Sequence, residues 1–225
     1  MLAKLFERKD HSGKPPFYRP YRSDAANQIY NLLFCDNPAL FGNGATAGGA
    51  LGAVLSEQTR GEALEDIGRD VDAESRVRAL AFNRLRAMNL PVPPKLLLGT
   101  IIEFPQRKGL DTLAIFGDKR LRYINHSEKM AIFETSPPTL IPLADKVLRA
   151  SQLAIDQHGP ADEPRRPPPT GKNLRLSFLV SDGLYFAEGQ FEQLMGDRFA
   201  GPVLDSATDL LPVLVEEGLR RERAK

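Results

Sequence analysis

The sequence predicts an α+β fold built on an antiparallel sheet of about six strands, and three observations support this. Helical periodicity dominates residues 23–88, four short strand-like runs follow one another, and two more come after a helix and a proline-rich stretch. Strands grouped in hairpins are typical of α+β proteins, whereas a doubly wound parallel sheet would alternate strand and helix. A four-stranded meander plus one hairpin therefore accounts for the predicted sheet.

Residues 1–22 form a basic segment without an apolar period. They hold six Lys and Arg residues against two acids, and three prolines interrupt them. Such a composition is typical of an extended chain end. We expect a basic extended arm here, with the folded part beginning at residue 23.

Helices are expected between residues 23 and 88. Ser23 is a suitable N-cap for the first, and its apolar side chains recur at helical spacing, at Ala26, Ile29, Tyr30, Leu33 and Phe34. This helix is expected to end near residue 37. A short helix over 62–68 and a longer one over about 72–88 are predicted next.

A glycine-rich run separates the first helix from the others. Gly44, Gly48 and Gly52 are four residues apart, which on a helix would form a smooth ridge for close packing. A surface loop explains the run as well, because each glycine lowers helix stability by about 1 kcal/mol relative to alanine. The spacing GxGxxxG does not match a dinucleotide fingerprint, and a helix rather than a strand precedes it.

The chain changes character after residue 94. Four runs rich in β-branched and aromatic residues follow, separated by turn signals: LLLGTIIEF, LDTLAIFGD, RLRYINHS and KMAIFET. Short strands joined in this way predict an antiparallel meander.

A helix, a connector, a hairpin and a last helix complete the chain. Residues 140–157 return to helical periodicity, whereas residues 160–171 hold five prolines in twelve positions, which predicts a semi-rigid connector. NLRLSFLV alternates strictly and turns at 181–183 into LYFAEG, so a second hairpin is expected. The last helix is expected from about Ser206 to Arg223, capped by Ser206 and Asp209.

Residues 23–225 are expected to form a single α+β domain. Two strands alone are marginal in water, so the hairpin should join the meander. Phe178 and Val180 of the hairpin alternate in the same way as Leu113 and Ile115 of the meander. The sequence therefore predicts one core beneath both groups, covered by the helices at 140–157 and 206–223.

The net charge and the cysteine content restrict the partners and the cellular compartment that the sequence favours. The 225 residues carry 30 Lys and Arg against 29 Asp and Glu, a net charge of +1, which gives no general attraction to nucleic acid or an anionic membrane. A single cysteine forms no internal disulfide. Charged residues interrupt the N-terminal apolar stretch, and no segment has the character of a membrane span. We expect a cytoplasmic protein without a membrane partner.

No catalytic or metal-binding motif is present in the sequence. His11, His126 and His158 are far apart and form no HExxH or His-x-x-x-His pattern. There is no GxSxG nucleophile elbow, and Cys35 lies beside Phe34 on a predicted apolar helix face. No catalytic residue, metal or cofactor is therefore predicted.

The third predicted strand carries the most polar chemistry. Arg120 and Arg122 share one face by the two-residue period, and Tyr123 lies on the other. Arginines near aromatic rings can bind nucleic acid or an anionic ligand. A solvated strand face with ion pairs to Asp111 or Glu134 is the alternative.

Four further residues are candidates for contact with a ligand or partner. Asn125 shares the strand face of Tyr123, and His126 lies in the turn that follows. In the hairpin, Tyr185 lies within the second strand, and Glu188 stands at its end before a glycine. An acid at a strand end beside an aromatic side chain can mark a pocket, or it can cap the helix that follows.

Two segments of the chain carry a resemblance. GLDTLAIFGDKRLRYINHSEKM and LRLSFLVSDGLYFAEG resemble segments of an uncharacterised bacterial protein family. The resemblance covers part of the chain. It implies a bacterial cytoplasmic origin and no particular activity.

Three function classes remain open. The first is a non-enzymatic protein that acts through contacts with another protein or with its own copies. The second is a small enzyme with a pocket between sheet and helices, using Arg122, His126 or Glu188. The third is a nucleic-acid binder through the basic arm and Arg120 with Arg122, which the balanced charge makes the least expected. A pocket joining the three residues of the second class would favour an enzyme, and scattered positions would count against it.

Overall fold

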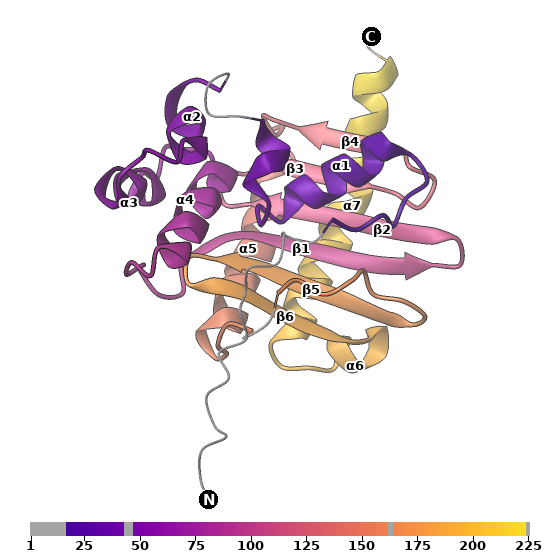
Figure 1. The fold of residues 1–225 in the computed structure, drawn as a ribbon. Helices are drawn as coiled ribbons and strands as arrows, with labels where there is room; N and C mark the ends of the chain where they lie inside the picture. Colours follow the sequence, from indigo (N-terminus) through magenta and orange to yellow (C-terminus); the bar gives the residue numbers. More distant parts are fainter. Residues whose placement is uncertain (1–16, 43–46, 162–163, 224–225) are drawn as a thin grey trace, which may run out of the picture.

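A six-stranded sheet with helices on both faces forms the body of the computed structural model (Figure 1). The structure describes residues 17–42, 47–161 and 164–223. The helices are α1 (Asp24–Leu33), α2 (Gly49–Leu55), α3 (Gly61–Arg69), α4 (Ser75–Ala87), α5 (Ile141–Asp156), α6 (Phe191–Met195) and α7 (Ala200–Arg223), with a 3₁₀ turn at Pro38–Phe41. The predicted α+β arrangement is confirmed.

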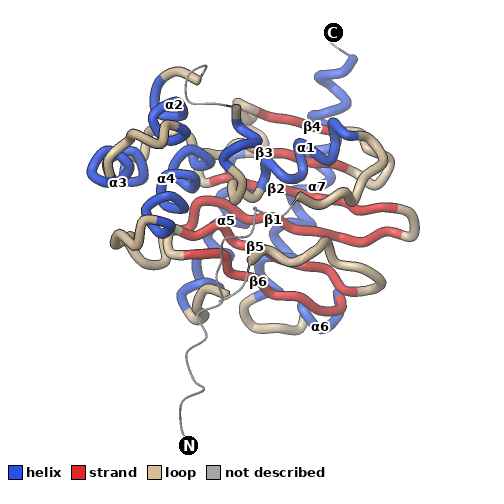
Figure 2. The backbone as a smooth tube through the Cα atoms, viewed as in Figure 1, coloured by secondary structure: helices blue, strands red, loops and turns tan. Residues whose placement is uncertain are grey.

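The strands pair in the order β4-β3-β2-β1-β5-β6, and every pair is antiparallel. Their bounds are β1 Leu97–Gln106, β2 Gly109–Phe116, β3 Leu121–Ile124, β4 Met130–Phe133, β5 Asn173–Val180 and β6 Gly183–Gln190. Figure 2 shows them as one continuous layer between the helices. The meander and the hairpin are joined where β1 pairs with β5, as the sequence predicted.

One core lies between the sheet and the helices α5 and α7. Ile102, Leu113 and Ile115 of the meander share this core with Phe178 and Val180 of the hairpin. From α7, the side chains that enter it recur at helical spacing, at Val203, Ala207, Leu210 and Leu214. The single core predicted beneath both strand groups is confirmed on this face.

A second core lies on the opposite face, beneath α1 and α4. Tyr30 and Leu33 of α1 are buried there with Phe82 of α4. Ile101 and Phe116 point into the same cluster from the sheet. Because β1 and β2 send side chains into both cores, their runs read as almost continuously apolar.

The chain that enters α1 is packed against the second face. Tyr21 is buried, and its hydroxyl lies 2.8 Å from Thr112 Oγ1. The Tyr18 hydroxyl donates to the carbonyl oxygen of Arg165 at 2.8 Å. Ser23 caps α1 as predicted. The arm predicted over 1–22 is therefore packed over residues 17–22, and its remaining part lies outside the described residues.

The last helix begins earlier than the sequence predicted. It starts at Ala200 rather than near Ser206, because Asp197 Oδ1 accepts the backbone N–H groups of Phe199 at 2.8 Å and Ala200 at 2.7 Å. Pro202 lies in the first turn, where its missing N–H has no helical partner to lose. The predicted cap at Ser206 is therefore wrong, and the helix is 24 residues long.

The proline-rich connector passes around the β6 edge between the two faces. The N–H of Ala161 donates to the carbonyl oxygen of Leu184 on β6 at 2.9 Å. Further along, Arg165 is buried against α1, and its Nε donates to Asp36 Oδ2 at 2.7 Å. The described parts of the connector are therefore fastened to the sheet and to α1.

Phe178→Ala is expected to lower the free energy of unfolding by about 3–5 kcal/mol, because removal of a buried aromatic ring leaves a cavity. Phe178 is 4% exposed and lies in the core shared by both strand groups. Urea unfolding followed by circular dichroism should show one transition, shifted to lower urea.

Leu153→Ala is the matched control, since Leu153 is 67% exposed on α5. Its effect should stay within about 0.5 kcal/mol. Two separate transitions in Phe178→Ala, one for residues 172–225 alone, would contradict a core shared by meander and hairpin.

Candidate functional site

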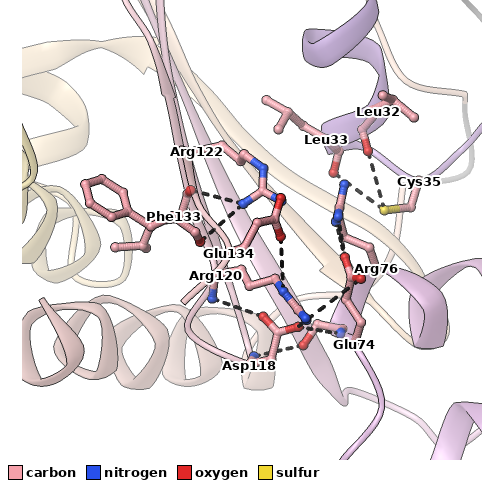
Figure 3. A network of polar contacts seen from close by, with 12 residues as sticks. Leu32, Leu33, Cys35, Glu74, Arg76, Asp118, Arg120, Arg122, Phe133 and Glu134 are labelled. Atoms are coloured by element: carbon pink, nitrogen blue, oxygen red, sulfur yellow. Dashed lines mark hydrogen bonds and ion pairs between the residues drawn. The ribbon is translucent and has the colours of Figure 1, made fainter. Parts of the chain in front are cut away.

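Arg120 and Arg122 lie within a network of carboxylates (Figure 3). Arg122 is buried, and its Nη2 is 2.6 Å from Glu134 Oε1. Arg120 Nη1 is 2.7 Å from Asp118 Oδ2 and 3.8 Å from Glu74 Oε2. Ion pairing with Glu134, the alternative given to these arginines, is thus present. Both positive charges are balanced within the molecule, so this pair offers little attraction to an anion.

Asn125 and His126 shape the turn between β3 and β4. Asn125 Oδ1 accepts the backbone N–H of Lys129 at 3.0 Å. His126 is half-exposed, and its Nδ1 lies 3.0 Å from Asp111 Oδ1, which also accepts the His126 backbone N–H at 2.6 Å. Both side chains therefore act on the turn. Tyr123 points to the α7 side of the sheet, where it packs against the first core.

Tyr185 and Glu188 lie on β6, at the far edge of the sheet, and on different faces. Tyr185 is buried in the first core, and its hydroxyl donates to Asp182 at 3.2 Å. Burial, followed by the charge of Asp182, raises the pKa of Tyr185 to about 12. Glu188 Oε2 is 2.8 Å from Arg175 Nη2 on the other face. Both residues nevertheless line one cavity, together with His158 and Phe199.

The structure does not bring Arg122, His126 and Glu188 together. Arg122 lies on β3 and Glu188 on β6, with β2, β1 and β5 between them. At about 4.8 Å for each strand spacing, this separation is about 19 Å. His126 is in the β3–β4 turn, also remote from β6. The three residues are too far apart to act on one small substrate.

A buried polar row crosses the sheet beneath α1. Thr112, Glu103, Arg175 and Glu188 stand opposite one another on β2, β1, β5 and β6. The Tyr30 hydroxyl donates to Glu103 Oε1 at 2.6 Å, and Arg175 Nη1 is 3.9 Å from Glu103 Oε2. Among the described residues, Glu103 Oε2 has no hydrogen-bond partner. The row is therefore satisfied except at this one oxygen.

Glu103 is fully buried in this row, with 0% of its surface exposed. Burial raises its pKa to about 7, although the Tyr30 hydrogen bond and the Arg175 charge lower it. A perturbed carboxyl group marks a candidate active site when it lies in a cleft. Glu103 is sealed beneath α1 rather than placed in a cleft, so its shifted pKa does not mark a candidate active site.

A cavity of about 370 Å³ lies between the connector, α4 and the β5–β6 hairpin. Arg86 lines it, but its guanidinium donates to the carbonyl oxygen of Ser181 and to Asn83 Oδ1. Asp36 also lines it and is held by Arg165. The charged groups of this cavity are therefore engaged within the chain.

A second cavity of about 340 Å³ lies between α5, β6 and the start of α7. His158 and Phe199 meet edge to face there, with ring centroids 5.3 Å apart. His158 Nδ1 is 2.8 Å from the carbonyl oxygen of Ala154, and Asp197 caps α7. Asp197 is therefore engaged as a cap, whereas the hydrogen bond at Nδ1 leaves the Nε2 atom of His158 without a hydrogen bond among the described residues.

The clearest open apolar surface is a groove beside α7, on the side away from α5. Its larger part has a volume of about 260 Å³, its smaller part about 80 Å³, and Tyr123 lines both. We call it the α7 groove. Its wall is Leu204, Leu211, Val215 and Leu219, and its floor is Phe104, Leu113, Tyr123 and Ala131.

The wall of the α7 groove is a second apolar stripe on a helix that already has one. The other flank of α7 faces α5, where Lys146 Nζ is 2.7 Å from Asp209 Oδ2. Val215 and Leu219 remain 37% and 44% exposed, and they contribute to no core of the described chain. The groove is therefore an apolar surface without a covering element among the described residues.

Two basic turns lie side by side at the outer end of the groove, and of their cations Lys129 lines it. Arg107 and Lys108 are exposed in the β1–β2 turn, and Lys129 is exposed in the β3–β4 turn. Gly109, with a φ of +106°, lets the turns meet, because a Cβ there would lie 2.9 Å from the His126 carbonyl oxygen. Within the described ranges, no ion pair engages these three cations.

Sequence reasoning found the floor of this groove but missed its wall. Tyr123 and Asn125 were candidate residues, and both line the groove. Leu204 was overlooked because the last helix was expected to begin after it. Leu211 and Val215 lie inside the expected helix, but they were not recognised as part of a second apolar stripe. The spacing of these three residues, seven and then four positions, is the signal that could have found the stripe.

The described part of the chain also lacks a metal-binding cluster and a membrane-spanning helix. No group of three or more His, Cys, Asp or Glu residues is placed there to hold a metal ion. No helix in these ranges has the length and apolarity to cross a membrane. Cys35 is a buried free thiol, and burial raises its pKa.

Comparisons of the chain with protein-family models, with curated proteins and with solved structures give no match. The functional assignment therefore rests on the residues described above.

The stabilities of the wild type and Glu103→Gln are expected to diverge with pH. The folded carboxyl has a pKa of about 7 against its usual 4.5. The folded state therefore binds the extra proton between these values, and this group costs stability as the pH rises from about 5 to about 8. Glutamine resembles the neutral acid at every pH.

Urea unfolding of both proteins at several pH values checks this. The free energy of unfolding of the variant minus that of the wild type should increase by on the order of 1–3 kcal/mol across this range. Parallel pH curves would show that Glu103 is not the group that titrates near neutral pH.

Proposed function

We propose that this chain is a non-enzymatic, bacterial cytoplasmic protein that acts by binding another protein through the α7 groove. The observation that carries the proposal is the pair of exposed side chains Val215 and Leu219 beside β3, β4 and the turn between them. A contiguous exposed apolar surface with a polar rim is typical of a protein-binding site.

The alternative of a small enzyme has less support from the structure. Arg122, His126 and Glu188 lie apart, and each has a partner within the chain. The two cavities beside the hairpin contain charged groups that are already paired or serve as caps. No group in either cavity is poised as a nucleophile beside a base.

The alternative of a nucleic-acid binder is weakened by the carboxylates around Arg120 and Arg122. Nucleic-acid affinity comes mainly from cations that neutralise phosphates. Here Glu134 and Asp118 already neutralise the two arginines. Residues 1–16 of the basic arm lie outside the described residues.

The cytoplasmic part of the proposal rests on chemistry rather than on a targeting segment. The single cysteine is a buried free thiol, which suits a reducing compartment and needs no disulfide partner. The bacterial part rests on the resemblance of the two β segments to bacterial sequences.

Photocrosslinking in cells that make the protein naturally tests the proposal. p-Benzoylphenylalanine at Leu219 is expected to give a discrete adduct with one other protein, because this position lies in the groove wall. Mass spectrometry identifies the partner, and a reciprocal crosslink from the partner confirms the contact.

The same amino acid at Leu153 is the control, since this leucine is exposed on a helix outside the groove. It should not give that adduct. Absence of an adduct at Leu219, or the same adducts at both positions, would count against the α7 groove as a binding site.

A further inference from the structure

We propose that the α7 groove binds an amphipathic helix of a partner protein, with Asp or Glu along the flank that faces Arg107, Lys108 and Lys129. This inference rests on the proposed function and names the chemistry of the partner. Three features carry it: the uncovered length of the sheet, the spacing of the groove wall and the charge of the rim.

The sheet leaves room for one more helix beside α7. β1 has ten residues and is about 33 Å long. Thr100 Oγ1 donates to Ser151 of α5 at 2.8 Å and Ile102 lies beside α7, whereas Phe104 and Gln106 extend further. Figure 2 shows the β1–β2 hairpin projecting past α7. From residue 102 to residue 106 the strand extends about 13 Å. Phe191 of α6 approaches part of this strip, with its ring centroid 6.1 Å from that of Phe104. Since packed helices lie about 8–10 Å apart, the strip has room for one helix beside α7.

The groove favours a helix over an extended strand. Its floor is the face of a sheet, where the backbone groups of β1, β2 and β3 are already paired with neighbouring strands. An extended peptide placed there would find no ladder to join, so its own N–H and C=O groups would be buried without partners. A helix satisfies these groups internally and offers only side chains.

The groove wall sets the length and pattern of the partner. Leu204, Leu211, Val215 and Leu219 span 15 positions, which corresponds to about 22 Å of helix. A partner helix of about four turns covers this stripe. Its anchors should recur at three or four residues, as in other complexes of a helix with an apolar groove.

The rim sets the charge of the partner. Arg107, Lys108 and Lys129 are exposed at the outer side of the groove without an ion pair in the described ranges. Asp111 lines the larger part of the groove, where it accepts hydrogen bonds from His126 and Gln106. Glu128 is turned to the other side and accepts the N–H groups of residues 22 and 23. Glu222 lies at the far end of the groove, on α7. A helix that packs against the strands therefore meets Asp111 and Glu222 within the groove and positive charge where its outer flank faces the two turns, and acids are favoured on that part of the flank.

Selection of peptides on the full-length chain tests this inference. The probe is a displayed random peptide library, with peptides long enough to cover the stripe. Enriched peptides are expected to show apolar residues at i, i+3 or i+4 and i+7 with acids along one flank, and to become helical when they bind. Enrichment of non-periodic or neutral peptides, or no enrichment, would overturn the inference.

Two variants locate the binding and its charge dependence. Leu219→Glu and the double change Arg107→Glu with Lys108→Glu should each weaken a selected peptide at least tenfold, and added salt should weaken wild-type binding. A peptide with its flanking acids changed to lysine should regain affinity for the double variant. Affinity unchanged by either variant would place the peptide elsewhere.

Matched controls separate these effects from misfolding and from net charge. Leu153→Glu introduces the same charge on an exposed helical leucine. Arg60→Glu with Arg149→Glu reverses two exposed cations outside the groove. Both controls should bind like the wild type, and circular dichroism of every variant should match it. Loss of binding in the controls would contradict the assignment to the groove.

Other occupants give different results. Competition by a synthetic peptide of residues 1–16 would show that the chain covers its own groove, and a dimer abolished by Leu219→Glu would show a second copy there. Either result overturns the inference. If photocrosslinking at Leu219 identifies a partner but the selected peptides are extended or neutral, the proposed function stands and the inference of a helical, acidic partner is contradicted. If both photocrosslinking and peptide selection fail, the proposed function and the inference of a helical partner are both contradicted.

Discussion

The pairing of β1 with β5 is the contact on which the rest of the structure depends. It joins a meander of local hairpins to a hairpin that follows some seventy residues later, and it sets Ile102 beside Leu176 and Glu103 beside Arg175. Side chains alternate between faces, so a shift by one residue would place Glu103 in the core beneath α5 and α7. The register of this one pair therefore fixes both cores at once.

The two faces make different use of that register. On the α1 face, the row from Thr112 to Glu188 makes a polar core whose hydrogen bonds also reach Tyr30 and, through Arg175, the carbonyl oxygen of Arg166 in the connector. Buried charged groups stabilise a fold less than they select one arrangement, since each must find its own partner. On the α5–α7 face, the core consists of apolar contacts, which have no preferred direction. Its extent depends on how much of the strands α5 and α7 cover.

Local sequence patterns predicted the features that depend on residues close together in the chain. Alternation and turns placed all six strands, Ser23 was recognised as the cap of α1, and the shared alternation of Leu113 and Phe178 indicated one core. Contacts between distant segments were not predictable in this way. Tyr21 is held by Thr112, and Arg122 is paired with Glu134, and in both cases the partner is distant in the sequence or lies at the end of another strand. The α7 groove exists because the strands extend beyond the helices that cover them. The early start of α7 depends on the cap Asp197. This local signal was missed because Gly201 and Pro202, which follow it, disfavour a helix by composition.

The end of α7 is held to β4 by Arg221, which stacks on the Phe133 ring and donates to the Thr135 carbonyl oxygen, but its exposed apolar side chains are not explained by the fold. Leu214 is the last fully buried residue of the helix, and Figure 1 shows the helix continuing past β4. Polar residues at 215 and 219 would leave both cores unchanged, because neither side chain belongs to them. Exposed apolar side chains at these positions favour association. They lie on the same side of α7 as Leu204 and Leu211, so the four side chains form one stripe. A stripe of which only Leu204 belongs to a core, beside a strip of sheet about one helix wide, is best explained by a helix that the chain itself does not supply.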